Sequence, residues 1–203
     1  LLVVDQRAPL FFGSVQCFKS VLAAHIAAFL AWAALGNGDR LGAIVLGDNL
    51  EREVKPRRSK HAVLELLHVL NDMNHLLTSP IATPSKSRKA LSQRLVEARR
   101  LAKPGTAVFI ISDFNDLDAE CEQSLFELKR HTDLTLIQVY DPLEQTLNAK
   151  ASLALSNGQE RIQVDAGSRQ FQQAYTASFD GRNETIMRIC RQLGLPLLRY
   201  ATN

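Results

Sequence analysis

Two aspartates, Asp5 and Asp113, each follow a short apolar run and open a loop. The runs span residues 1–4 and 107–111, and both are typical of buried strands. In an α/β protein the carboxyl ends of parallel strands meet at one edge of the sheet, where ligands bind. Paired carboxylates suit a hard cation such as Mg²⁺, which prefers oxygen ligands. The sequence therefore predicts a crevice that Asp5 and Asp113 share.

The loop after Asp5 reads Gln6-Arg7-Ala8-Pro9 and contains no hydroxyl side chain. Arg7 is a permanent cation, and its guanidinium would oppose a metal ion placed beside it. Three arrangements are open: Arg7 pairs with Asp5 or Asp113 in place of an ion, a weak Mg²⁺ site persists, or Arg7 points to solvent. We favour the pairing, because an internal cation relieves the repulsion between two neighbouring carboxylates.

The strongest local charge is the basic stretch at residues 55–60, Lys-Pro-Arg-Arg-Ser-Lys. Arg57 and Arg58 could contact an acidic or phosphate group of a partner, since Ser59 begins a helix whose free N–H groups favour anions. A solvated loop explains the same residues. More basic residues surround the helix expected at 89–101, and basic-patch nucleic-acid binding is the matching alternative. Aromatic residues make up only 6% of the chain and no stacking motif is present, so we expect no nucleic-acid partner.

Catalytic motifs with a known mechanism are missing from the sequence: it contains no GxSxG, no P-loop, no GxGxxG and no HExxH. We therefore expect a protein that is not an enzyme and has no cofactor. The enzymatic alternative is a Mg²⁺-dependent hydrolase or phosphotransferase that uses Asp5 and Asp113. It predicts metal-dependent turnover that is lost in Asp113→Ala.

Strand and helix patterns alternate along the chain and must position these residues. Strands are expected at 1–4, 41–46, 51–55, 107–111, 134–140 and 197–200, a hairpin around 157–158, and helices at 14–36, from 59, at 89–101, 117–130 and 168–193. In the first helix we expect one buried face, made of Phe18, Leu22, Ile26, Phe29 and Ala33. The pattern predicts an α/β fold, a three-layer, doubly wound, mainly parallel sheet flanked by helices, in one domain over residues 1–203.

Composition fits an ordinary globular domain, with 46% hydrophobic and 22% charged residues and a net charge of +3. The Ala-rich segment 21–35 is shorter than the roughly 20 residues of a spanning helix, so we expect a core helix and no membrane span within this chain. Three scattered cysteines without a CxxC pair favour reduced thiols and a cytoplasmic location. The absence of an initiator Met leads us to expect a fragment of a longer protein.

An ordered set of residues resembles a known family. Asp5 after an apolar strand, Phe12-Gly13-Ser14, Lys19, the Ala/Leu-rich helix, and Gly38-Asp39-Arg40-Leu41-Gly42 are similar to the von Willebrand factor A-like domain called domain of unknown function 58. Pro56-Arg57-Arg58 and Leu193-Gly194-Leu195-Pro196 resemble the same family, so the resemblance spans nearly the whole chain.

The resemblance implies a doubly wound sheet and a metal-ion-dependent adhesion site with a DxSxS loop. Asp5 matches its first aspartate and Asp113 its last, and Ser85 falls near the middle hydroxyl, with Thr83 and Ser87 as alternatives. Arg7 and Pro9 stand where the two serines belong, which implies a degenerate site.

The resemblance also implies an adaptor or chaperone-like partner of a MoxR-type AAA+ ATPase. We therefore expect a non-enzymatic protein-interaction module. Its crevice would receive an acidic or polar side chain of the partner beside Asp5, Arg7 and Asp113.

Overall fold

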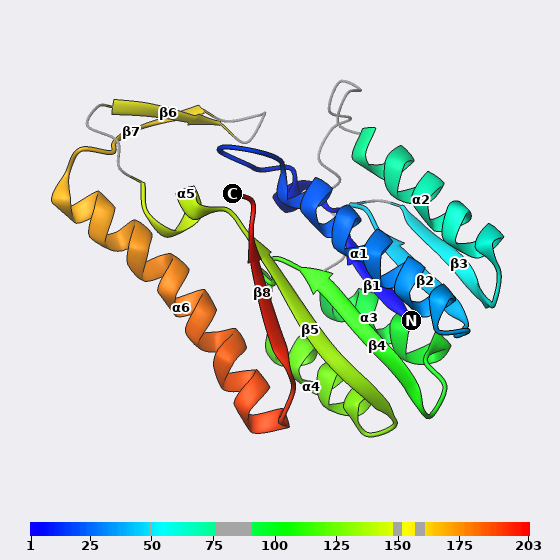
Figure 1. Cartoon of the computed structure of the whole chain (residues 1–203). Helices are drawn as coiled ribbons and strands as arrows, with labels where there is room; N and C mark the ends of the chain where they lie inside the picture. The colour runs from blue at the N-terminus through cyan, green and yellow to red at the C-terminus, as the bar shows by residue number, and fades with distance from the viewer. Residues whose placement is uncertain (49, 76–90, 148–151, 157–160) are drawn as a thin grey trace.

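The computed structural model describes residues 1–48, 50–75, 91–147, 152–156 and 161–203. Six strands form one sheet in the order β3-β2-β1-β4-β5-β8, and β6 and β7 form a separate antiparallel hairpin (Figure 1). The strands are β1 (Leu2–Asp5), β2 (Leu41–Leu46), β3 (Glu51–Arg57), β4 (Thr106–Ser112), β5 (Thr132–Tyr140), β6 (Ser152–Ser156), β7 (Arg161–Asp165) and β8 (Leu197–Ala201). Only β3 runs antiparallel to its neighbour within the six-stranded sheet.

Helices cover both faces of this sheet. They are α1 (Lys19–Gly36), α2 (Lys60–His75), α3 (Leu91–Leu101), α4 (Ala119–Lys129), α5 (Pro142–Gln145) and α6 (Arg169–Leu193). Figure 1 shows α1 and α2 on one face and α3 and α4 on the other. One apolar core joins α1 and α2 to the sheet through residues such as Ala27 and Leu66, and a second joins α3, α4 and α6 through residues such as Leu95 and Leu125. The predicted three-layer, mainly parallel architecture is confirmed.

The strand order places the crevice. β1 pairs with β2 on one side and with β4 on the other. The strands that follow β1 in the chain are therefore added first on one side of it and then on the other, so the strand order reverses at β1. Ligand sites of doubly wound sheets lie at such a switch point, outside the carboxyl ends of the strands. Asp5 ends β1 and Asp113 directly follows β4. The two aspartates therefore lie at the same edge, as the sequence predicted.

The first helix differs from the prediction in its start and in its buried face. It begins at Lys19 instead of after Ser14, and it packs through Ala23, Ala27 and Ala31, which are fully buried. Phe29, expected inside, is 76% exposed. Alanines at a spacing of four residues form a flat stripe that lets the helix backbone approach the strands closely. Leu22 and Ile26, also expected inside, flank this stripe and pack partly buried against the core.

The basic stretch also differs from the prediction, because Pro56 does not interrupt regular structure. It lies within β3, an edge strand, where a missing N–H is tolerated. Gly42 of β2 accommodates the ring: a Cβ at Gly42 would lie 2.7 Å from Pro56 Cγ, and the register shifts beside it.

Among the described residues, α1 is the one helix long and apolar enough to cross a membrane by length and composition. Core helices of soluble proteins and signal sequences near an N-terminus meet the same criterion. In this structure α1 lies against the sheet (Figure 1).

Candidate functional site

Asp5 is fully buried at the end of β1, and donors surround both of its carboxylate oxygens. The backbone N–H and Nε of Arg7 donate to Oδ1 at 3.0 and 2.9 Å. The Nη2 of Arg7 and the hydroxyl of Ser112 donate to Oδ2, both at 2.7 Å. Ser112 ends β4, so this hydroxyl links the ends of two neighbouring strands.

Arg7 binds a second carboxylate, Asp116, and thus bridges two parts of the chain. Its Nη1 and Nη2 donate to Asp116 at 2.5 and 3.0 Å, and its side chain is only 7% exposed. From the sequence we expected Arg7 to pair with Asp5 or Asp113. In the structure it pairs with Asp5, and its second partner is Asp116. Burial alone would lower the pKa of Arg7, but the hydrogen bonds to Asp5 and Asp116 outweigh it and raise this pKa. We call these three residues the arginine network.

Asp113 is paired with a different cation, Lys19, at the start of α1. Lys19 Nζ lies 2.9 Å from Asp113 Oδ2 and 2.7 Å from Glu144 Oε1, and the lysine is fully buried. Burial lowers the pKa of Lys19, yet the charges of Asp113 and Glu144 raise it overall. The pKa of Asp113 is raised by its burial, which the nearby Lys19 offsets only in part. We call Lys19, Asp113 and Glu144 the lysine network.

The loop after β4 has a strained backbone at Phe114, between the two carboxylates Asp113 and Asp116. Phe114 has φ of 53°, the left-handed region, and it is the one non-glycine residue with positive φ in the described part of the chain. Its N–H binds the Ser112 hydroxyl at 3.1 Å, and Asn115 donates to Asp113 from both its backbone and its side chain. Such strain collects at functional sites. Here it allows Asp113 and Asp116 to point toward different cations.

Asp141 fastens the loop between β1 and α1 to the end of β5. It is fully buried and accepts from the N–H and hydroxyl of Ser14 at 2.8 and 2.6 Å, and from the hydroxyl of Thr202. Burial raises the pKa of Asp141, but the hydrogen bonds from Ser14 and Thr202 lower it overall. Glu144 caps the same turn by accepting from the Asp141 N–H at 3.0 Å. The lysine network and this loop therefore share α5.

These carboxylates do not fit a divalent cation as they stand. Both oxygens of Asp5 accept from Arg7, and Oδ2 of Asp113 accepts from Lys19 and Asn115. An ion would have to displace two buried cations, and it would find few free lone pairs. Within the part of the chain that the structure describes, no group of three or more His, Cys, Asp or Glu side chains could hold a metal ion. Ser85, the expected middle ligand, lies outside the described residues.

Arg57 and Arg58 do not belong to the crevice. Arg57 pairs with Leu41 at the beginning of β2, whereas Leu46 at the other end of β2 pairs with Asp5. The two arginines therefore lie at the opposite end of the sheet. Both are exposed, and the Arg57 side chain is 3.9 Å from that of Glu65.

The basic patch expected around residues 89–101 is also smaller than the sequence suggested. Arg94 is buried, pairs with Glu51, and donates to the carbonyl oxygens of Gly47 and Asp48 at 2.8 and 3.1 Å. It holds the β2–β3 turn and is not available to a polyanion.

Sequence reasoning missed three members of these networks as site residues, namely Lys19, Glu144 and Asp116, and it also missed Asp141, which anchors the neighbouring loop. Lys19 contributed only to the family resemblance. One local signal could have identified it: a single charged side chain opens a helix, 19–36, that otherwise has His25 as its only strongly polar residue besides Ser20. A lysine at such a position needs a buried partner.

Solved structures identify the class of fold. BatB from Bacteroides thetaiotaomicron superposes on all of this chain and 89% of its own, with a TM-score of 0.59 at 12% identity. An aerotolerance-related membrane protein from Bacteroides fragilis gives 0.55 at 14% identity, over 95% of this chain and 96% of its own. The von Willebrand factor A domain of SpRpn10 gives 0.45 at 11% identity, over 100% and 87%. The chain has a von Willebrand factor A-like fold, which it shares with the first two of these structures.

Within this class, residues 1–185 match the family described as protein of unknown function DUF58, and the chain belongs to it. Uncharacterized proteins of Mycobacterium tuberculosis (strain H37Rv) and Mycobacterium bovis are each 27% identical over 207 residues. The alignments cover all of this chain and 62% of those proteins. The chain thus spans less than two thirds of the length of the curated relatives it matches.

Proposed function

We propose that the chain is a non-enzymatic protein-interaction module with a degenerate adhesion site, in which two internal cations take the place of a divalent ion. The observation that carries this proposal is the position of Arg7, whose guanidinium makes four side-chain hydrogen bonds to Asp5 and Asp116. Lys19 neutralises Asp113 in the same way. A crevice whose carboxylates are already paired can keep its shape without metal, so partner binding is independent of Mg²⁺.

The partner we propose is a MoxR-type AAA+ ATPase, on the strength of the resemblance to the family. The interaction would take place in the cytoplasm. The von Willebrand factor A-like fold supports an interaction role, and the edge of the sheet that holds Asp5 and Asp113 is the natural contact surface. Arg57 and Arg58 lie at the opposite end of the sheet, so they would serve a separate contact.

The chemistry expected of the partner changes with the geometry. An acidic side chain entering the crevice would need a cation that is free to bind it. Both Arg7 and Lys19 are already engaged by two carboxylates each, and both are buried. We therefore propose that the partner contacts this edge of the sheet without inserting an acidic side chain.

Calorimetric titration of the chain with MgCl₂ and MnCl₂ tests the metal-free crevice. We expect no binding in the micromolar range, and a low-micromolar dissociation constant would refute the proposal. In parallel, the chelator-treated chain is mixed with the MoxR-type ATPase of the same genome in nucleotide-free, metal-free buffer. Complex formation is expected to be equal to that of chain pre-incubated with Mg²⁺ and then desalted. Binding that appears only after Mg²⁺ treatment would contradict independence from metal.

A further inference from the structure

Residues 11–18, which directly precede α1, form a closed loop next to the lysine network. The N–H of Lys19 binds the Phe12 carbonyl at 2.8 Å, which closes the segment into a loop. Gly13 allows this closure, because a Cβ there would lie 2.1 Å from the Cys17 carbonyl oxygen. Ser14 anchors the middle of the loop to the buried Asp141. The shape of the loop is therefore fixed from within.

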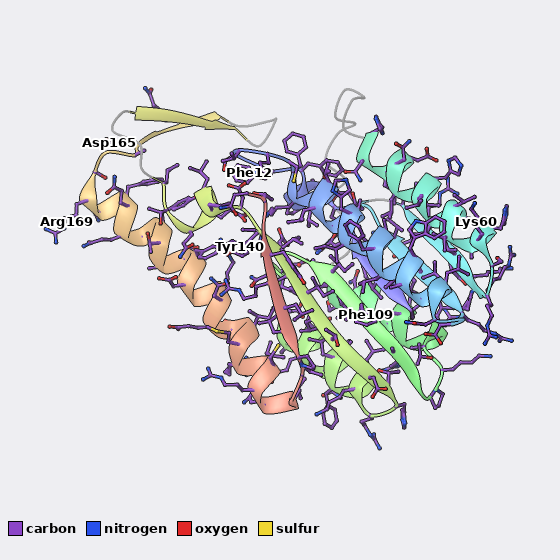
Figure 2. All side chains as sticks on the ribbon, viewed as in Figure 1. Phe12, Lys60, Phe109, Tyr140, Asp165 and Arg169 are labelled. Carbon is purple, nitrogen blue, oxygen red and sulfur yellow. The ribbon has the colours of Figure 1, made fainter. Side chains whose placement is uncertain are left out.

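This loop points apolar side chains outward. Val15 is 73% exposed, Phe18 49% and Phe12 38%. Figure 2 shows Phe12 beyond the carboxyl ends of the strands, the end at which Asp5 and Asp113 lie. We call Phe12, Val15 and Phe18 the apolar loop. A loop that is anchored by buried hydrogen bonds and yet exposes three apolar side chains is typical of a contact surface.

The two networks beside the apolar loop contain more carboxylates than cations. The two networks place four carboxylates around two cations, a formal excess of two negative charges. The Asp116 side chain is 38% exposed and that of Glu144 is 16% exposed, so this excess reaches solvent. Lys19 and Ser14 connect the loop directly to this region, because they bind Glu144 and Asp141.

We infer that the apolar loop and the exposed carboxylates of the two networks, Asp116 and Glu144, form one docking surface for a protein segment that carries apolar side chains next to lysine or arginine. The inference rests on the proposed function and names the chemistry of the partner. A cation of the partner would be attracted by the excess negative charge, whereas an acidic segment would be repelled. The same charge disfavours an anionic membrane, which attracts basic surfaces.

The experiment uses a phage-displayed library of random 12-residue peptides, panned on the chain and counter-selected on the variant Val15→Ser/Phe18→Ser. We expect the enriched peptides to combine apolar residues with Lys or Arg, and to bind the variant at least tenfold more weakly. The matched control is Phe29→Ser, which removes an even more exposed aromatic side chain from the outer face of α1. It should leave binding unchanged. Circular dichroism melting checks that both variants remain folded.

Several results would overturn the inference. These are enrichment of acidic peptides, equal binding by Val15→Ser/Phe18→Ser, and no enrichment over the counter-selection. Flotation of the chain with phosphatidylglycerol vesicles would assign the surface to a membrane, and sedimentation as a dimer that Val15→Ser/Phe18→Ser dissolves would assign it to a second copy. Panning is repeated with 5 mM MgCl₂: peptides that bind only with Mg²⁺ would count against the metal-free function, and peptides of the wrong charge against this inference alone.

Discussion

The arginine network and the lysine network solve the same electrostatic problem with different chemistry. In each, one buried cation lies between two carboxylates at the carboxyl edge of the sheet. Arg7 is planar and makes four hydrogen bonds to Asp5 and Asp116, whereas Lys19 is a point charge that binds Asp113 and Glu144 once each. Arg7 lies two residues from Asp5 and 109 from Asp116, whereas Lys19 is 94 and 125 residues from its partners.

The two networks therefore differ in one half only: the Arg7–Asp5 pair is a local motif, whereas the Arg7–Asp116 pair and both pairs of Lys19 are products of the fold. The Arg7–Asp5 pair can form as soon as the loop after β1 turns, but the contact with Asp116 requires the loop after β4. The lysine network requires α1, the loop after β4 and α5 to be in place together. Removing the charge of Lys19 should therefore lower the free energy of unfolding of the whole domain. For Arg7, the loss should depend on whether the substitute keeps the planar set of donors.

The largest effect is expected for Lys19→Met, which keeps the apolar stem and removes the charge. Asp113 and Glu144 then face each other without a cation, and breaking a buried pair in this way costs about 3–5 kcal/mol. Urea denaturation at neutral pH measures the change in the free energy of unfolding. The control is Lys60→Met at the exposed start of α2. A loss below about 1 kcal/mol for Lys19→Met would mean that the lysine network does not support the fold.

A smaller effect is expected for Arg7→Lys, which keeps the charge and removes the planar donor set. A lysine cannot bind Asp5 and Asp116 bidentately, so we expect a loss of about 1–3 kcal/mol in the free energy of unfolding. Arg57→Lys on the exposed edge of the sheet is the control and should change it by less than about 0.5 kcal/mol. Equal stability of Arg7→Lys and the native chain would show that charge alone suffices in this network.

The same contrast explains what the sequence could predict. Asp5 and Asp113 follow apolar runs, and Arg7 is adjacent to one of them, so strand periodicity and chain order are sufficient to place these three near one crevice. No sequence pattern links Lys19 to Glu144, because the two residues are 125 positions apart and meet only when α5 is placed beside the start of α1. Asp116 was visible in the chain but ambiguous, since two aspartates three residues apart compete for the same cation.

Packing was also harder to predict than topology. The order of strands and helices was correct, while the buried face of α1 was correct only for Leu22 and Ile26, which pack against the core. A helix that is apolar on all sides offers no contrast from which to choose a face. The packing of α1 against the sheet decides which face is buried: Ala23, Ala27 and Ala31 lie against the strands, and Phe29 is exposed.

The two networks should respond to pH with opposite sign. The hydrogen bonds from Arg7 outweigh burial and lower the pKa of Asp116, so its stabilising contribution is present above the unfolded pKa, about 4, and is lost as pH falls below that value. Burial raises the pKa of Asp113, so its contribution becomes less favourable as pH rises above about 4. Both effects are smaller than those of the cation substitutions, and that of Asp116 is further reduced by solvent screening.

Unfolding free energies between pH 3 and 7 measure these signs. Asp116→Asn should flatten the loss of stability below pH 4, and Asp113→Asn should make stability rise more steeply with pH above it. Asp180→Asn on the exposed side of α6 serves as the control. Curves that change in the same direction for Asp113→Asn and Asp116→Asn would contradict the assignment of the two carboxylates to different cations.

The smallest effect concerns metal. Arg7→Ser/Pro9→Ser supplies the two hydroxyls that the first loop lacks, yet Lys19 still occupies Asp113. We therefore expect 10 mM MgCl₂ to stabilise this variant by less than about 1 kcal/mol, since a ligand stabilises only as far as its concentration exceeds its dissociation constant. Adding Lys19→Ser frees Asp113 and should increase the Mg²⁺-dependent rise in melting temperature, with CaCl₂ and NaCl of equal ionic strength as controls. If Arg7→Ser/Pro9→Ser alone responds as strongly as the triple variant, the arginine network by itself excludes the ion, and Lys19 has a purely structural role.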